Sequence, residues 1–358
     1  MSAALHQSWP PFVLIAGLLL IGLLANRDGL FAWGGARLQS LPGGGVALLA
    51  AALLLDAVVT AVLNLDTAVV FLTPVLVFAA RRRRVAVEPF LYGCVFMANG
   101  SSLFLPGSNL TNLLVLDAHG SGSGASFAAK MFPLAITAAV VTAVGIAVTF
   151  RRAFAAGPGR GAAADQVGAR VGSDAAPTVV LGTGLLATLA AVVLVLALRQ
   201  PATAVLAVGL VATGVELARS RVEPAEVWRV LGLPSLLVAF VLTVALGTLA
   251  RHWDGPAELI AGASGPETAG LAALSTVLVN NLPAAALYSA HAVDHSRMLL
   301  LGLNVGPNLA VTGALSALLW FRAAREVDAR PSLLEFSRRG VPLALAGLAA
   351  AILVGMVT

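Results

Sequence analysis

Two stretches of the chain combine polar side chains that could bind a small solute with glycines and prolines that interrupt a helix. The first, "GSSLFLPGSNLTN" at 100–112, is rich in hydroxyls and amides although its flanks are apolar. The second, "GPNLAVTG" at 306–313, matches residues 100–107 in the pattern Gly-x-x-Leu-x-x-x-Gly. Glycine permits an unwound backbone, and the ends of the half-helices then offer free N–H and C=O groups. We therefore expect a binding site of amides and hydroxyls at these two interruptions.

Polar residues from both interruptions are the candidates to line this site. They are Ser108, Asn109, Thr111 and Asn112 from the first interruption, and Asn304, Asn308, Thr312 and Ser316 from the second. Small and polar residues also mediate packing between membrane helices, so packing remains an alternative for each of them taken singly. We interpret Ser102 and Thr73 as packing residues.

Two acids fall inside apolar sequence, where a charge costs about 2.5–3.5 kcal/mol on insertion scales. Asp66 lies in "NLDTAVV", which interrupts the apolar stretch 43–80. A carboxyl there could exchange a proton with each side of the membrane in turn, or coordinate a cation, and we expect Asp66 to couple transport to protons. The alternative is an N-cap at the start of a helix. Asp56 is the second candidate for coupling.

The composition is that of a membrane protein. Of the 358 residues, 59% are hydrophobic and 11% are charged, against about 25% charged in soluble domains. The mean hydropathy is +0.92. Runs long enough to span a bilayer occur at 10–26, 127–150, 178–198, 201–218, 230–249 and 341–357. We therefore predict an all-α polytopic protein of the plasma membrane.

Several classes of function are not expected. The arginines are scattered between apolar spans without aromatic interleaving, which does not fit nucleic acid. The single cysteine, Cys94, excludes a disulfide framework and a multi-thiolate metal site. The histidines have no ligand spacing, so we predict no metal site and no cofactor. We also expect no enzyme, since no nucleophile and base pair lies at membrane depth.

The order of segments predicts two halves. The first, 1–150, contains a re-entrant hairpin at about 43–80 and a broken helix at about 87–118. Residues 151–177 read as a cytoplasmic linker, since they are rich in Gly, Ala and Pro. The second half, 178–358, contains a hairpin at about 257–295 and a broken helix at about 297–320. Each hairpin could instead cross the membrane twice, but Pro74 and an arm of about 15 residues after Asp66 argue against this.

Basic residues set the orientation. With the hairpins re-entrant, 18 of the 22 Lys and Arg residues fall on one face, which is then cytoplasmic. The other four are Lys130, Arg199, Arg251 and Arg297. The two halves are then upside down relative to each other, and inverted repeats with interrupted helices are typical of secondary transporters.

Four motifs resemble the arsenite permease family within the ion transporter superfamily. They are "NLDTAVVFLTP" (64–74), "ANGSSLFLPGSNLTNLLV" (98–115), "VNNLPAAAL" (279–287) and "LLGLNVGPNLAVTGALSALLW" (300–320). The resemblance implies export of arsenite or antimonite in exchange for protons, a possible soluble arsenite-stimulated ATPase as partner, and scaffold helices of a kind that often dimerise. It implies hairpin-tip residues Asn64, Asp66, Thr67, Asn280, Asn281 and Pro283, and unwound-segment residues Asn99, Gly107, Ser108, Asn109, Asn112, Asn304, Gly306, Asn308, Thr312 and Gly313.

The chain departs from this family at two points. It has room for only one scaffold helix before the first hairpin, and "AVTGALS" lacks a proline and a hydroxyl that the permeases carry. A sodium/proton antiporter or an anion carrier of the dicarboxylate type is therefore the alternative. Arsenous acid is neutral near pH 7 and suits amides and hydroxyls. A dicarboxylate more often needs Lys or Arg, which neither interruption contains, although the amino ends of half-helices can also bind anions.

Overall fold

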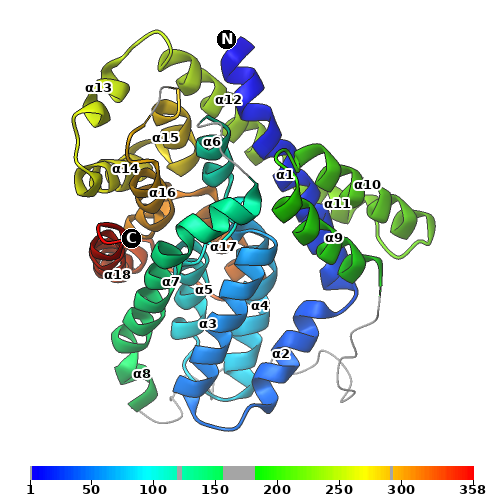
Figure 1. The fold of residues 1–358 in the computed structure, drawn as a ribbon. Coiled ribbons are helices and arrows are strands. Elements are labelled where there is room, and N and C mark those ends of the chain that lie inside the picture. Colours follow the sequence, from blue (N-terminus) through cyan, green and yellow to red (C-terminus); the bar gives the residue numbers. More distant parts are fainter. Residues whose placement is uncertain (1, 119–122, 156–181, 291–292) are drawn as a thin grey trace.

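The computed structural model describes residues 2–118, 123–155, 182–290 and 293–358 of the chain. Every regular element in those ranges is a helix (Figure 1), which confirms the prediction of an all-α protein. Of the predicted linker 151–177, residues Arg151–Ala155 form α8, and the remainder lies outside the described residues.

The first half contains one helix pair, α3 and α4, and one broken helix, α5 and α6, which η1 separates. Its elements are α1 (Ser2–Arg27), α2 (Leu30–Ser40), α3 (Gly45–Val62), α4 (Leu65–Arg82), α5 (Glu88–Gly100), η1 (Pro106–Ser108), α6 (Leu110–Ala118), α7 (Gly124–Thr149) and α8.

The second half repeats the order of helix pair, helix break and long helix after five leading helices, α9 to α13. Its elements are α9 (Thr183–Ala197), α10 (Ala202–Ala218), α11 (Pro224–Leu231), α12 (Leu233–Leu249), α13 (Gly255–Ala261), α14 (Gly265–Val279), α15 (Asn281–Tyr288), α16 (Ser296–Val305), η3 (Gly306–Leu309), η4 (Val311–Gly313), α17 (Leu315–Glu326) and α18 (Leu333–Gly355).

Within the described residues, five helical segments are long and apolar enough to cross a membrane. They are Ala4–Arg27, Gly45–Val62, Gly124–Thr149, Pro224–Leu249 and Leu333–Gly355, and the apolar helices α9 and α10 are shorter. Many side chains on their outer surfaces are aliphatic, for example Leu237 and Val241 of α12, which are 65% and 57% exposed. Such a surface is stable only against lipid, so the protein is a multi-pass membrane protein.

Small residues let the outer helices approach closely. A Cβ atom on Gly17 of α1 would lie 2.8 Å from the Cα atom of Leu206, and one on Gly209 of α10 would lie 2.8 Å from the carbonyl oxygen of Gly17. The backbones of α1 and α10 therefore touch, as is common between membrane helices. On another side of the molecule, α7 packs along α18.

Each helix pair turns at an asparagine. Between α3 and α4, Asn64 is extended, and its Oδ1 atom accepts a hydrogen bond of 2.6 Å from the N–H of Thr67. Between α14 and α15, Asn280 has a φ of 75° and its Oδ1 atom accepts from the N–H of Leu282 at 3.4 Å. Both residues cap the following helix.

The arms of the two pairs differ in length. The arm expected to have about 15 residues after Asp66 runs through Pro74 to Arg82, so α4 has 18 residues, as does α3. The second pair is shorter than its expected range of 257–295: α14 has 15 residues, α15 has 8, and α13 is a separate helix before them.

The two helix breaks have the same layout. The helices before the breaks end at Gly100 and Val305, and those after them begin at Leu110 and Leu315, so equivalent residues are 205 apart (305 minus 100, 315 minus 110). This structural register pairs Asn99 with Asn304. In the sequence motifs, by contrast, Gly100 matches Gly306, which is an offset of 206 residues. The two registers differ by one residue because the first break has one 3₁₀ turn, η1, and the second has two, η3 and η4.

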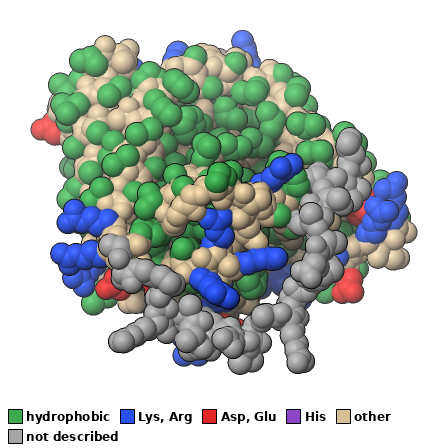
Figure 2. Space-filling view, turned by 90° about the horizontal axis from the view of Figure 1, so that it is seen from below, with side chains coloured by type: hydrophobic (Ala, Val, Ile, Leu, Met, Phe, Trp, Pro, Cys, Tyr) green, Lys and Arg blue, Asp and Glu red, His purple; other side chains and the backbone are tan. Residues whose placement is uncertain are grey.

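One end of the molecule is basic. Figure 2 shows Lys and Arg side chains gathered on the lower end of the molecule as drawn in Figure 1, with fewer Asp and Glu side chains on the visible part of this face. At the end of α4, Arg83 donates hydrogen bonds of 2.8, 2.8 and 2.6 Å to the carbonyl oxygens of Gln39, Leu41 and Gly43. The arginine run therefore also fixes the loop that leads into α3.

Candidate functional site

The turns of both helix pairs and both helix breaks meet around one small cavity, here called the chamber. The second arm of each pair packs against a half-helix of the other half of the chain, α4 against α17 and α15 against α6. The chamber between them is lined by Leu65, Asp66, Asn109, Leu110, Ala239, Asn280, Asn281, Leu282, Ala314 and Leu315. Its volume of about 20 Å³ leaves room for about one water molecule, so this conformation is closed around it.

Most chamber residues occupy equivalent positions in the two halves. Asp66 and Leu282 are each the second residue of the helix that follows a turn. Leu110 and Leu315 are each the first residue of the helix that follows a break. The backbone layout of the two halves therefore matches, but their chemistry differs, because the position equivalent to Asp66 is occupied by Leu282.

Asp66 is the acid of the chamber. It lies in the first turn of α4 and is only 4% exposed. The cap of that helix is formed by Asn64, and no side-chain hydrogen bond joins Asp66 to another residue that the structure describes. Three amides, those of Asn109, Asn280 and Asn281, share the chamber with it, and its described lining contains no Lys or Arg.

Behind the chamber, Asn304 is the centre of a buried amide network. Its Oδ1 atom accepts hydrogen bonds from Ser102 at 2.6 Å and from Asn109 at 2.8 Å. Its Nδ2 atom donates to Oδ1 of Asn112 at 2.9 Å and to the carbonyl oxygen of Leu300 at 2.8 Å, and lies 3.4 Å from Oγ1 of Thr111. The network thus joins the second break to the first.

A second link runs between Asn99 and Asn308. The Nδ2 atom of Asn99 donates to Oδ1 of Asn308 at 2.8 Å, and Nδ2 of Asn308 donates to the carbonyl oxygen of Phe96 at 3.1 Å. The hydroxyl of Ser316 lies 3.5 Å from Oδ1 of Asn99. These side chains are fully buried and satisfy one another, so in this conformation they fasten the two breaks together and do not face the chamber.

The remaining candidates bond to the backbone or pack. Ser108 donates to the carbonyl oxygen of Ala61 at 3.2 Å, and Thr312 donates to that of Val277 at 2.8 Å. Thr67, Pro283 and Gly107 are buried in packed positions.

Close contacts account for two of the glycines. A Cβ atom on Gly306 would lie 2.6 Å from the Cα atom of Ala273, and one on Gly313 would lie 2.5 Å from that of Pro307. Neither position has room for a side chain.

Asp56 lies apart from the chamber. It is fully buried in α3 against α5, where the thiol of Cys94 lies 3.7 Å from its Oδ1 atom, and Thr73 in turn lies 3.5 Å from the sulfur. Its Oδ2 atom has no partner among the described residues. Those residues also contain no group of three or more His, Cys, Asp or Glu side chains that could hold a metal ion.

Sequence reasoning missed the apolar lining and one polar residue. Leu110, Ala239 and Leu315 line the chamber, but an apolar residue within an apolar run gives no local signal. Ser102, which we interpreted as a packing residue, donates to Asn304. The signal that could have found Leu110 and Leu315 is their matching place after the two breaks.

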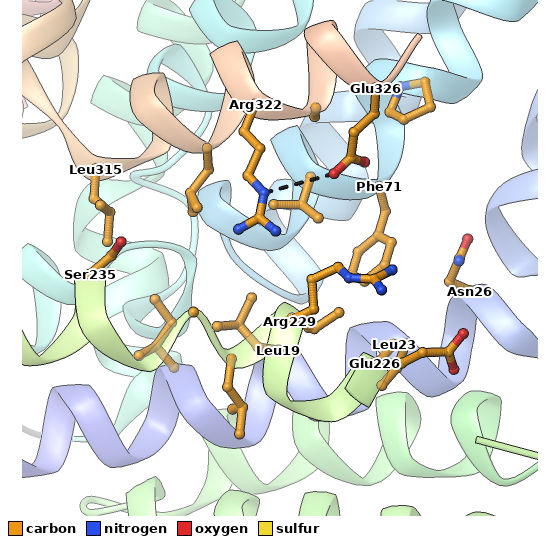
Figure 3. A pocket seen from close by; sticks show the side chains of 18 of the residues that line it. Leu19, Leu23, Asn26, Phe71, Glu226, Arg229, Ser235, Leu315, Arg322 and Glu326 are labelled. Carbon is orange, nitrogen blue, oxygen red and sulfur yellow. Dashed lines mark ion pairs between the residues drawn. The ribbon is translucent and has the colours of Figure 1, made fainter. Parts of the chain in front are cut away.

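A larger cavity of about 410 Å³, here called the vestibule, lies beside the chamber between α1, α4, α11, α12 and α17. Figure 3 shows Leu315 and Ser235 at one end of it and Asn26 and Glu226 toward the other. Two ion pairs border it: Arg27 with Glu226, and Arg322 with Glu326 at 3.8 Å. The vestibule contains none of the predicted site residues, so we place the candidate site in the chamber.

Comparison with known proteins identifies the family. The model of the family CitMHS, described as citrate transporter, matches residues 2–312. An arsenical pump membrane protein of Escherichia coli is 25% identical over 364 residues, which cover 94% of this chain and 83% of that protein. A 46 kDa membrane protein of Mycobacterium leprae (strain TN) is 25% identical over 376 residues, covering 96% and 85%.

A solved structure supports the same fold. The YdaH transporter of Alcanivorax borkumensis, whose crystal structure is described as revealing an unusual topology, matches with a TM-score of 0.56 at 15% identity over 99% of this chain and 86% of that one. The resemblance that four motifs carried thus extends over nearly the whole chain. The protein is a membrane transporter that belongs to the citrate transporter family, CitMHS, and it is similar to arsenical pump membrane proteins.

Proposed function

We propose that this transporter exports arsenite or antimonite in exchange for protons, and that the chamber is where both bind. One observation carries the proposal: Asp66 is a buried carboxyl without a hydrogen-bond partner among the described residues, and it shares the chamber with three asparagines. An unpaired acid at membrane depth is costly and marks a functional site by default.

The chemistry of the lining favours a neutral solute. Arsenous acid carries only hydroxyls near pH 7, and asparagine amides both donate to and accept from hydroxyls. A multiply charged anion such as citrate needs cations or several N–H donors opposite its carboxylates, and the described lining contains no Lys or Arg. The names of the similar arsenical pump membrane proteins agree with this choice.

Coupling follows from a shared site. In the proposal, Asp66 takes up a proton from outside when the chamber opens outward, and it releases that proton to the cytoplasm when the chamber opens inward and a solute enters. Because Asp66 and the three asparagines line the same chamber, the proposal makes proton binding and solute binding mutually exclusive. Exchange then proceeds with the chamber open to only one side of the membrane at a time.

The proposal includes an orientation. The two halves are inverted relative to each other, both helix pairs are re-entrant, and the basic end of Figure 2 is cytoplasmic. The repeated order of helix pair, broken helix and long helix supports this reading. A soluble ATPase subunit and a second copy of the chain are possible partners that the proposal does not require.

Transport into everted membrane vesicles tests the function. We expect uptake of radiolabelled arsenite when the vesicle interior is made acidic, and loss of that gradient-driven uptake in Asp66→Asn. Glu258→Gln, which changes an exposed acid at another site, is the matched control and should transport normally.

Three results would count against parts of this proposal. Absence of arsenite uptake under any gradient rejects the solute, and citrate and sodium-driven exchange are then the next tests. Uptake that Asp66→Asn leaves fully proton-driven rejects the coupling residue. Uptake by the purified chain in liposomes shows that no ATPase is needed, whereas inactivity there with activity in cells would indicate a partner.

A further inference from the structure

The chamber and the vestibule share one wall residue, Leu315. It lines both cavities, and it is partly exposed between them. Leu315 is the first residue of α17, directly after Ala314, whose backbone is extended with a φ of −150°. A side chain at the free end of a half-helix is held by fewer neighbours along the chain than one in the middle of a helix.

Three helices pass from one cavity to the other. Along α12, Ser235 and Leu236 line the vestibule and Ala239, one turn later, lines the chamber. Along α4, Asp66 lines the chamber and Val70, one turn later, lines the vestibule. Along α17, Leu315 is followed one turn later by Leu319, which lines only the vestibule. The cavities are therefore separated by about one helical turn, or roughly 5 Å.

The far end of the vestibule is charged. Arg27, Glu226, Arg229, Arg322 and Glu326 are among its lining residues, whereas Figure 3 shows Leu315 and Ser235 together at the end beside the chamber. The side chains of Arg27, Arg322 and Glu326 are 42%, 55% and 59% exposed, so the charged end is open to solvent. The volume of about 410 Å³ is large enough for a small hydrated solute.

We propose that the vestibule is the route by which solute reaches the chamber from the basic side, and that Leu315 is the residue that closes this route. The inference rests on the chamber being the transport site, as proposed above. Leu110, at the equivalent place after the first break and lining only the chamber, would close the opposite side. Passage on the basic side then requires that Leu315 leaves its position between the two cavities.

Two cysteine positions on α12 report on the two sides of this barrier. In a Cys94→Ala background, which removes the single native thiol, Ser235→Cys places a thiol in the vestibule and Ala239→Cys places one in the chamber. A charged, membrane-impermeant methanethiosulfonate reagent is added to everted and to right-side-out vesicles. We expect Ser235→Cys to react quickly in everted vesicles only, and Ala239→Cys to react much more slowly there.

Removal of the leucine should change one of these rates. Leu315→Ala is expected to raise the labelling rate of Ala239→Cys about tenfold in everted vesicles, because labelling follows the fraction of time for which the barrier is open. The rate for Ser235→Cys should not change. Leu319→Ala, the same substitution one turn further along α17, is the matched control and should leave both rates unchanged.

The outcomes separate this inference from the proposed function. Equal rates for Ala239→Cys and Ser235→Cys before any change at Leu315, or the same rise with Leu319→Ala as with Leu315→Ala, would overturn the closing role of Leu315. If Leu315→Ala folds poorly, Leu315→Phe provides the opposite test and should slow labelling of Ala239→Cys. None of these rates depends on arsenite, so a failure of arsenite transport alone rejects the solute and leaves the barrier standing.

Discussion

The side chain of Asn109 donates a hydrogen bond of 2.8 Å to Oδ1 of Asn304, 195 residues later in the chain. Asn109 lines the chamber, whereas Asn304 is fully buried behind it. Because the Oδ1 atom of Asn109 also accepts a hydrogen bond of 3.2 Å from the N–H of Thr111, the two bonds together fix the orientation of this amide. The geometry of the candidate site therefore depends on contact between the two halves.

Asn304→Ala should destabilise the protein and abolish transport. The substitution removes one buried hydrogen-bond partner from each of Ser102, Asn109 and Asn112, and each group left unsatisfied costs about 1–3 kcal/mol. Thermal unfolding in detergent measures the loss. Asn26→Ala, at an exposed asparagine of the vestibule, is the control and should unfold as the native protein does. Equal stability of the two variants would contradict the role of the network.

Asp56→Asn should keep proton-driven transport, unlike Asp66→Asn. Asp56 lies outside the chamber, and an asparagine there can still accept the hydrogen bond from Cys94 through its Oδ1 atom. We expect its stability to change by no more than about 1 kcal/mol, because the substitution keeps the shape of the side chain. Parallel uptake assays with a gradient of pH compare the two variants. If Asp56→Asn loses proton-driven transport, the proton-coupling residue is Asp56 of α3 and not Asp66.

Gly306→Ala should destabilise the second break by about 1–3 kcal/mol, since its Cβ atom would lie 2.6 Å from backbone at Ala273. Gly107→Ala is the same substitution at a buried glycine of the first break. Its Cβ atom would lie 3.4 Å from a side-chain carbon of Val195, which is an ordinary contact, so this variant should fold normally. Unfolding midpoints of both variants in detergent check the difference. If Gly107→Ala is the less stable of the two, the close contact of Gly306 with Ala273 is not what limits stability at the breaks.

Asn64→Ala should cost about 1 kcal/mol of stability, because it removes the cap of α4 at the N–H of Thr67. Asn64→Ser, which can also accept that hydrogen bond, should restore most of the loss. Chemical unfolding curves provide the measurement. If the alanine and serine variants are equally unstable, Asn64 acts through something other than capping, such as contact with the solute.

Local sequence predicted much of this protein. Runs of apolar residues predicted the membrane helices, because a segment that crosses lipid must satisfy its own backbone and expose apolar side chains. Asn64 and the "GSSLFLPGSNLTN" stretch marked a turn and a break, since asparagine caps a helix and glycine and proline interrupt one. The motifs also identified Asp66, Asn109, Asn280 and Asn281, which do line one chamber.

Tertiary structure decided which polar residues face the chamber and which face one another. Asn109 and Asn112 have the same chemistry three residues apart, and the packing of α16 against α6 gives both the partner Asn304, but only Asn109 also lines the chamber. In the same way, Asp56 and Asp66 both lie in one apolar stretch, and only the position of α5 sets Asp56 against Cys94 and away from the chamber. Leu315 carries no local signal at all, because its place between two cavities results from where α4, α12 and α17 meet. Spans and breaks are thus local properties of the chain, whereas the site and the barrier beside it arise from contacts between residues far apart in sequence.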